Sequence, residues 1–158
     1  MSNKLHIKYY VEPDRAALAR HAVQYLVEMA SEAVEAQGRA RIAISGGSTP
    51  KAAFELLADP HQPWRTRMPW HALDIYWVDE RCVPPDNAES NYRMTREALL
   101  DHVPLQPDQI HRIFGELAPE AAADRYEQEL RSNSGLKTQE SSAPVRASSS
   151  CVLIPPPE

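Results

Sequence analysis

The sequence predicts an α/β fold in which a mostly parallel sheet is flanked by helices. Two observations indicate this class. Short runs rich in β-branched and aromatic residues alternate with longer segments whose apolar residues recur at helical spacing. In addition, a glycine-rich segment directly follows one of the short runs, at a junction between strand and helix. The 158 residues suffice for one domain of ordinary size.

The expected elements follow in chain order, and the first of them is a strand over residues 5–11, where apolar and polar residues alternate. A helix is expected from about Asp14 to Gln37, with Gly38 as its C-terminal cap. Its predicted buried stripe follows three- and four-residue steps and consists of Leu18, Ala22, Leu26, Met29 and Ala33. The later elements are strands over 41–44, 73–78 and 110–114 and helices over 50–57, 92–101 and 119–131.

The segment Ser45-Gly46-Gly47-Ser48-Thr49-Pro50 joins the strand over 41–44 to a helix. Its paired glycines permit positive φ angles and a close approach of the backbone to a ligand. Ser48 or Thr49 is expected as the N-cap and Pro50 at the first helical position. Free N–H groups and the positive end of a helix dipole would then meet at one place, as in phosphate sites. An ordinary tight turn is the alternative, and the segment matches neither a Walker loop nor G-x-G-x-x-G.

A second polar segment, Asp79-Glu80-Arg81, follows the strand over 73–78. Arg81 offers a planar fork of donors suited to phosphate. Asp79 and Glu80 can accept hydrogen bonds from sugar hydroxyls, orient Arg81 or transfer a proton. Asn91 adds a polar group before the next helix, for which Ser90 is the expected N-cap. A solvated loop with a local ion pair is the alternative, but both polar segments follow strands, and ligands bind beyond the carboxyl ends of parallel strands.

Composition excludes several classes of function. The net charge of −5 opposes a broad nucleic-acid footprint. Cys82 and Cys151 form neither a disulfide framework nor a zinc motif, so no metal site is expected. No signal peptide and no membrane-spanning run is evident, and a cytoplasmic location is therefore expected. Most of the six histidines fall away from both polar segments, and surface or structural roles are expected for them.

Together the two segments resemble the 6-phosphogluconolactonase family, whose superfamily includes glucosamine-6-phosphate deaminase. The resemblance extends from about Leu5 to Arg131 and implies a modified Rossmann-like fold of the phosphosugar isomerase/lactonase type. The deaminase branch usually has Asp-Glu-Tyr where this chain has Asp79-Glu80-Arg81, so the arginine favours the lactonase. The matching residues are Ser45-Gly46-Gly47-Ser48-Thr49-Pro50 and Trp77-Val78-Asp79-Glu80-Arg81, followed by Val83-Pro84, Asp86 and Ser90-Asn91-Tyr92.

The resemblance implies a hydrolase that converts 6-phospho-D-glucono-1,5-lactone to 6-phosphogluconate in the oxidative pentose phosphate pathway of carbohydrate metabolism. The expected partner is therefore a small phosphorylated sugar lactone, with no cofactor, no metal, no nucleic acid and no membrane. The implied substrate and phosphate contacts are Ser45, Gly46, Gly47, Ser48, Thr49, Asp79, Glu80, Arg81 and Asn91.

The chain departs from the family pattern in one respect. The family's Gly-x-Gly-x-Asp-Gly-His segment, whose histidine is held to activate the hydrolytic water, does not occur in this sequence. No catalytic residue is therefore assigned. From Ser132 the sequence becomes rich in Ser and Pro, which predicts an α/β domain over 1–131 and a disordered tail over 132–158.

The break in composition suggests a truncated or frame-shifted member of the family that lacks the general base. Two alternative functions stay open at this point. One is a non-catalytic sugar-phosphate-binding module, and the other is an enzyme similar to glucosamine-6-phosphate deaminase or isomerase.

Overall fold

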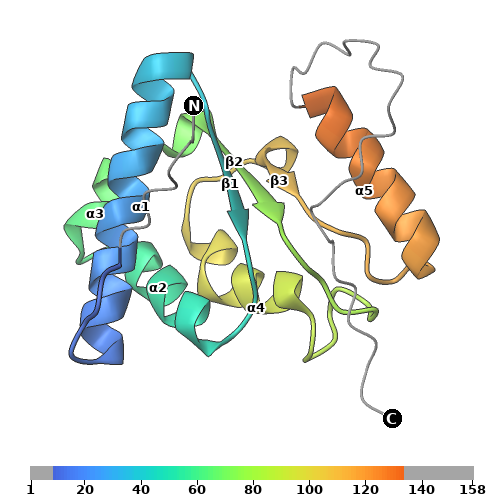
Figure 1. Cartoon of the computed structure of the whole chain (residues 1–158), viewed down its shortest axis with the longest axis horizontal. Coiled ribbons are helices and arrows are strands. Elements are labelled where there is room, and N and C mark those ends of the chain that lie inside the picture. Colours follow the sequence, from blue (N-terminus) through green and yellow to red (C-terminus); the bar gives the residue numbers. More distant parts are fainter. Residues whose placement is uncertain (1–8, 134–158) are drawn as a thin grey trace, which may run out of the picture.

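A computed structural model describes residues 9–133 and confirms the predicted class, a parallel sheet flanked by helices. The sheet has the order β1-β2-β3, and both pairs of neighbouring strands are parallel. In Figure 1 it lies between α1 on one side and α5 on the other. The strands are β1 (Ala40–Ile44), β2 (Leu73–Trp77) and β3 (Ile110–His111).

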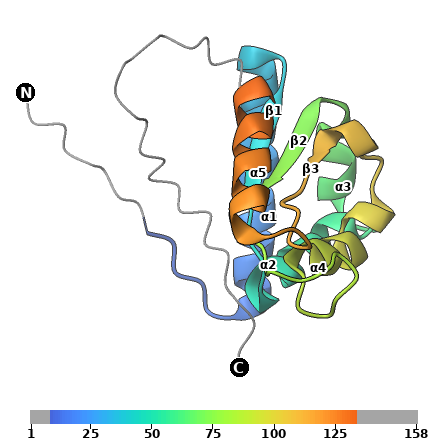
Figure 2. The ribbon, with the colours of Figure 1, turned by 90° about the vertical axis from the view of Figure 1, so that its right-hand side faces the viewer.

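The helices connect successive strands and cover the sheet. α2 and α4 lie at the end of the sheet to which the strands point, as Figure 1 and Figure 2 both show. The α-helices are α1 (Arg15–Gln37), α2 (Ser48–Ala58), α3 (Pro63–Arg67), α4 (Asn91–Ala98) and α5 (Pro119–Asn133). Three short 3₁₀ helices are η1 (Trp70–Ala72), η2 (Leu100–His102) and η3 (Pro107–Gln109).

The central strand β2 is buried over its whole length, which includes the polar Asp74. A strand between two parallel neighbours, with both faces covered, carries side chains shielded from water on both sides. Ile75 marks the register, since it pairs with Ile42 of β1 and with Ile110 of β3. The buried Asp74 is compensated by an ion pair with Arg39, whose Nε lies 2.9 Å from Asp74 Oδ2.

Both predicted ends of α1 are confirmed, because Asp14 accepts a hydrogen bond from the Ala17 N–H and Gly38 adopts a left-handed conformation. The predicted buried stripe is wrong. Leu18, Ala22 and Met29 are exposed, while Leu26 and Ala33 are half-buried. The helix packs on α2 and β1 through the neighbouring row, whose small side chains permit a closer approach to these elements. This row consists of Ala19, Val23, Val27 and Ala30.

Two predicted strands differ from the structure. Residues 9–11 form no strand, and Tyr9 and Val11 are 80% and 91% exposed. Alternating polarity does not make a strand where no neighbouring strand supplies hydrogen bonds. Residues 5–8 lie outside the described residues. The last strand ends at His111 rather than 114.

Beyond the end of β3, the Tyr126 hydroxyl of α5 supplies hydrogen bonds to the backbone of β2. It donates to the Trp77 carbonyl oxygen at 2.8 Å and accepts from the Trp77 N–H at 2.9 Å. The buried backbone groups of Trp77 are therefore satisfied by a side chain instead of a ladder partner. A second link joins Glu129 of α5 to His111 of β3 at 2.8 Å. These two contacts attach α5 to the sheet.

The predicted tail over 132–158 lies outside the described residues, apart from Ser132 and Asn133, which belong to α5. Between residues 9 and 133, no helix combines the length and the apolar character needed to cross a membrane.

Candidate functional site

Three loops meet at the edge of the sheet where the strands end, and two glycines make this convergence possible. A Cβ atom on Gly46, after β1, would lie 1.7 Å from Asn91 Oδ1. A Cβ atom on Gly115, after β3, would lie 2.2 Å from the carbonyl oxygen of Arg81. Any larger residue at either position would push the loops apart. The two polar segments singled out in the sequence therefore lie side by side.

The loop after β1 leads directly into α2. The N-cap is Gly47, with φ of 111°, so Ser48 and Thr49 occupy the first helical positions and Pro50 the third. The expected caps, Ser48 or Thr49, and the expected first position of Pro50 are therefore wrong. The helix begins earlier because only Gly47 can take the positive φ that turns the chain out of the strand. No side chain of residues 9–133 caps this helix start.

Glu80 is buried, with an exposure of 2%, and its carboxylate binds groups of the protein. Its Oε1 accepts from the Arg81 N–H and the Asn91 N–H, both at 2.7 Å. Its Oε2 accepts from the Tyr92 N–H at 2.9 Å and from Ser90 Oγ at 3.2 Å. Glu80 thus joins the loop after β2 to the N-terminus of α4, a position that favours a negative charge.

Asn91 connects the remaining parts of the site. Its Nδ2 donates to the Asp79 carbonyl oxygen at 3.2 Å and to Asp79 Oδ2 at 3.1 Å. The other side of the same amide packs against Gly46. Ser90 is the N-cap of α4, as predicted, because its Oγ accepts from the Arg93 N–H at 3.1 Å. Asp79 is therefore held in one orientation beside the loop after β1.

A pocket of about 410 Å³ opens between these loops. Arg81 is half-buried on its wall, and its Nε is buried without a hydrogen-bond partner among the described residues. α2 and α4 both begin at this pocket, and neither has an acidic residue in its first turn. Although the exposed Glu89 also belongs to the lining, the pocket combines the two cations Lys51 and Arg81 with a helix start and is therefore suited to an anion. Its lining consists of Gly47, Ser48, Lys51, Arg81, Ala88, Glu89, Ser90, Asn91 and Met94.

The two helix starts at this pocket differ in one respect. At α4 the donors are engaged, because Glu80 accepts from the first two N–H groups and Ser90 from the third. At α2 the N–H groups of Ser48 and Thr49 belong to an uncapped first turn, and such groups have no partner within their helix. The donors for an external anion are therefore those of α2.

A second arginine near the site is neutralised. Arg112 forms a bidentate pair with Glu116, at 2.9 and 2.6 Å, and its guanidinium lies 4.1 Å from the Phe114 ring centre. The hydrogen bond with Arg112 lowers the pKa of Glu116, and the same bond raises the pKa of Arg112. Arg112 thus contributes to the structure of the loop after β3, and Arg81 is the arginine of the anion pocket.

The expected proximity of the loops after β1 and β2 is confirmed. The sequence analysis did not single out Lys51 or Gly115 and did not predict the hydrogen bonds of Glu80 to the protein. Lys51 follows directly after the glycine-rich segment, so its place in the first turn of α2 was available as a signal. None of the histidines in residues 9–133 lines the pocket around Arg81. Within the same residues, no group of three or more His, Cys, Asp or Glu side chains is arranged to hold a metal ion.

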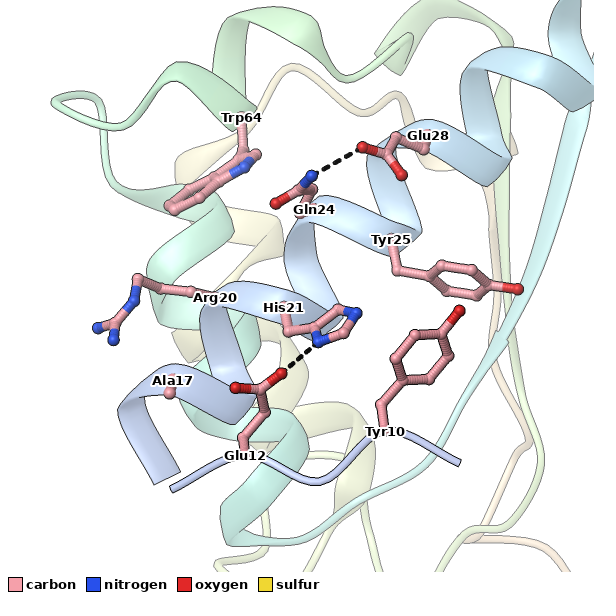
Figure 3. Close-up of a pocket in the computed structure, with 9 residues that line it drawn as sticks. All are labelled: Tyr10, Glu12, Ala17, Arg20, His21, Gln24, Tyr25, Glu28 and Trp64. Carbon is pink, nitrogen blue, oxygen red and sulfur yellow. Dashed lines mark hydrogen bonds and ion pairs between the residues drawn. The ribbon is translucent and has the colours of Figure 1, made fainter. Parts of the chain in front are cut away.

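A larger groove, of about 750 Å³, lies on the outer side of α1 and is shown in Figure 3. Four of its polar residues bind one another, in the pairs of Glu12 with His21 and Gln24 with Glu28, and Arg20 is the lining cation. Tyr10 packs edge-on against His21, with 4.6 Å between ring centres. Because the four paired residues already have partners, the groove presents no convergent set of donors comparable to the pocket at the strand ends.

Comparisons with known proteins show which family the chain is similar to. The pattern of the family described as glucosamine-6-phosphate isomerases/6-phosphogluconolactonase matches residues 13–146, a stretch that passes the boundary expected at residue 131. A 6-phosphogluconolactonase of Treponema pallidum is 41% identical over 112 residues, which make up 71% of this chain and 45% of the relative. A 6-phosphogluconolactonase of Nostoc is 37% identical over 122 residues, 77% of this chain and 48% of the relative.

Solved structures show the same similarity. The 6-phosphogluconolactonase of Thermotoga maritima has a TM-score of 0.66 at 27% identity, and the match covers 78% of this chain and 53% of that one. The enzyme of Leishmania guyanensis has a TM-score of 0.67 at 25% identity, with 78% and 50% covered. The chain spans about half the length of the relatives that it matches.

Proposed function

Because the chain belongs to the glucosamine-6-phosphate isomerase/6-phosphogluconolactonase family, we propose that this protein is a 6-phosphogluconolactonase. It would hydrolyse 6-phospho-D-glucono-1,5-lactone to 6-phosphogluconate, a step of the oxidative pentose phosphate pathway. Relatives that carry this name support the proposal, at 41% and 37% identity. The cytoplasmic location and the absence of a nucleic-acid partner stay predictions.

The observation that carries the proposal is the anion pocket at Arg81. A sugar phosphate has a charge of about −1.5 to −2 near neutral pH and three strong acceptor oxygens. The uncapped N–H groups of Ser48 and Thr49 and the dipole of α2 can accept this charge. The guanidinium of Arg81, a residue of the pocket lining, offers a planar fork of donors for the phosphate oxygens. We therefore assign the phosphate to the space between Arg81 and the start of α2.

The other predicted contacts have different roles under this assignment. Gly47 and Asn91 line the pocket, and Ser45 and Gly46 belong to the loop that leads to it. Asp79, which Asn91 holds beside that loop, can accept a hydrogen bond from a sugar hydroxyl. Glu80 has another role, because both of its oxygens bind the protein itself. Its function in this proposal is to hold the loop that carries Asp79 and Arg81.

Lactone hydrolysis also needs a base for the attacking water and donors for the developing oxyanion. The described residues provide the anion pocket and place Asp79 beside it. They place no histidine in the pocket lining. This observation favours a second candidate function, the binding of a phosphorylated sugar without turnover.

Two measurements on the 158-residue chain separate these candidates. Formation of 6-phosphogluconate above the spontaneous rate, followed by coupled reduction of NADP by 6-phosphogluconate dehydrogenase, would support the lactonase. Calorimetric binding of 6-phosphogluconate without turnover would support the binding module. Release of ammonia from glucosamine 6-phosphate would contradict both and indicate a deaminase, a reaction that Arg81 speaks against.

Arg81→Ala tests the location of the phosphate. It should weaken binding of 6-phosphogluconate by about 1.5–3 kcal/mol, the range for a hydrogen bond to a charged group. Arg41→Ala is the matched control, since Arg41 is an exposed arginine near the start of β1, at the opposite end of the strand from the pocket. Equal affinities of the Arg81→Ala and Arg41→Ala variants would place the phosphate elsewhere.

A further inference from the structure

We infer that Lys51 is a second cationic ligand of the phosphate, and that its ammonium group leaves Glu55 to bind it. The inference rests on the proposed function, because it takes the anion in the pocket to be a sugar phosphate. It adds a residue that sets the preference for phosphorylated over unphosphorylated sugars.

The position of Lys51 supports this role. It is the fourth residue of α2, and it lines the same pocket as Gly47, Ser48 and Arg81. Its side chain is 51% exposed, so the ammonium group can change position without disturbing the core. The pocket therefore has a fixed, half-buried cation in Arg81 and a movable one in Lys51.

The local energetics give a second argument. A positive charge in the first turn of a helix is unfavourable, because it faces the positive end of the helix dipole. The ion pair with Glu55 offers little compensation, since Nζ and Oε1 lie 3.8 Å apart and both side chains are about half exposed. A lysine that precedes its glutamate by four residues is also the weaker of the two orientations. Lys51 therefore does little for the stability of α2.

A bound phosphate would make the positive charge of Lys51 at the start of α2 favourable. Its negative charge at the same helix start would attract Lys51 and cancel the repulsion from the dipole. Two other cations nearby are held by closer partners, Arg112 by Glu116 and Arg93 by Glu97 and the Asp86 carbonyl oxygen. Of the two cations that line the pocket, Lys51 is the exposed one, and its contact with Glu55 is weak enough to be exchanged.

Three substitutions in the 158-residue chain test the inference, with calorimetric titration of 6-phosphogluconate and of gluconate. Lys51→Met keeps the length of the side chain and removes the charge. It should weaken binding of 6-phosphogluconate roughly fivefold, the effect of losing about 1 kcal/mol from one ion pair. The affinity for gluconate should stay unchanged. Lys51→Arg should retain most of the affinity.

Glu55→Gln is the matched control. It removes the same ion pair as Lys51→Met but leaves the lysine in place. The inference requires equal or tighter binding of 6-phosphogluconate by Glu55→Gln. Weaker binding in both variants would show that the ion pair acts through the stability of α2, and this result would overturn the inference. Urea unfolding of each variant checks that α2 is intact.

The same titrations distinguish failure of the inference from failure of the proposed function. Unchanged affinity in Lys51→Met, together with weakened binding in Arg81→Ala, would overturn the role of Lys51 and leave the phosphate site in place. Absence of any binding of 6-phosphogluconate to the unsubstituted chain would overturn both. A fall in affinity for gluconate that equals the fall for 6-phosphogluconate would also contradict the inference, because Lys51 would then not act on the phosphate.

Discussion

Gly46→Ala should disrupt the site through one steric contact. The added Cβ would lie 1.7 Å from Asn91 Oδ1 and 2.3 Å from Asn91 Cγ. An ordinary contact needs at least 3.4 Å, so the oxygen must move by about 1.7 Å. Asn91 is only 6% exposed and cannot swing freely into solvent. A movement of this size would break the two hydrogen bonds from Asn91 Nδ2 to Asp79.

The expected cost combines two effects. Overpacking of a buried position costs about 1–3 kcal/mol, and each lost hydrogen bond costs about 0.5–1.5 kcal/mol. Part of the strain is relieved as Asn91 moves, so we expect a loss of about 2–4 kcal/mol in the free energy of unfolding. Urea unfolding followed by tryptophan fluorescence measures this quantity. Binding of 6-phosphogluconate should weaken as well, because Asp79 loses its fixed orientation.

Gly38→Ala is the matched control for this substitution. Gly38 has a φ of 76°, and its added Cβ would meet no atom within 4 Å. The control should therefore cost about 1–2 kcal/mol from backbone conformation alone and leave ligand binding unchanged. The double variant of Gly46→Ala with Asn91→Ala supplies the decisive test. If Gly46→Ala lowers the free energy of unfolding equally in the parent chain and in Asn91→Ala, the steric argument is refuted.

Three further predictions concern the supports of the site. Glu80→Gln should destabilise the fold by about 1.5–3 kcal/mol in urea unfolding, because an amide cannot accept from all four donors that bind the carboxylate. Tyr126→Phe should cost about 1–3 kcal/mol, since both backbone groups of Trp77 would lose a partner, and an unchanged midpoint would contradict this assignment. Glu116 has a pKa lowered by Arg112. Its contribution is therefore present above the unfolded-state pKa, near 4.5, and is lost as the pH falls through the lower folded-state pKa. Thermal unfolding of Glu116→Gln should thus match that of the parent at acidic pH and fall below it at neutral pH.

The parts of the fold that the sequence revealed depend on local patterns. β2 was predictable because consecutive β-branched and aromatic residues indicate a strand covered on both faces. The meeting of the loops after β1 and β2 was predictable because neighbouring parallel strands end at the same edge. The caps of α1 were predictable because an Asp side chain accepts a hydrogen bond at the start of a helix, as Asp14 does, and a glycine adopts the left-handed conformation at its end, as Gly38 does.

The parts that the sequence did not reveal depend on contacts between distant segments. The buried row of α1 was misjudged because two neighbouring rows are both apolar, and the choice between them is made by packing on α2 and β1. The short β3 follows from Tyr126, which lies 49 residues from the backbone groups that it binds. Neither the helical period nor the residue types of the sequence indicate a contact between two such distant segments.

The role of Glu80 is the most informative difference between expectation and structure. In the sequence it stands between Asp79 and Arg81 and looks like a second ligand for a sugar. Its burial depends on the N-terminus of α4, which begins 11 residues later. Spacing alone does not show that a carboxylate and a helix start will meet, so the hydrogen bonds of Glu80 to the start of α4 could not be predicted from the sequence.

This position of Glu80 also explains why the anion should bind at α2 rather than α4. If the buried carboxylate of Glu80 were not bound by the protein, it would weaken the attraction of the adjacent Arg81 for phosphate. With its charge directed at the first N–H groups of α4, Glu80 closes that helix start to other anions. α2 begins at Gly47, which has no side chain to cap it, so its first donors stay available. The uncapped start therefore reduces the local stability of α2 and, in return, leaves these donors for the ligand.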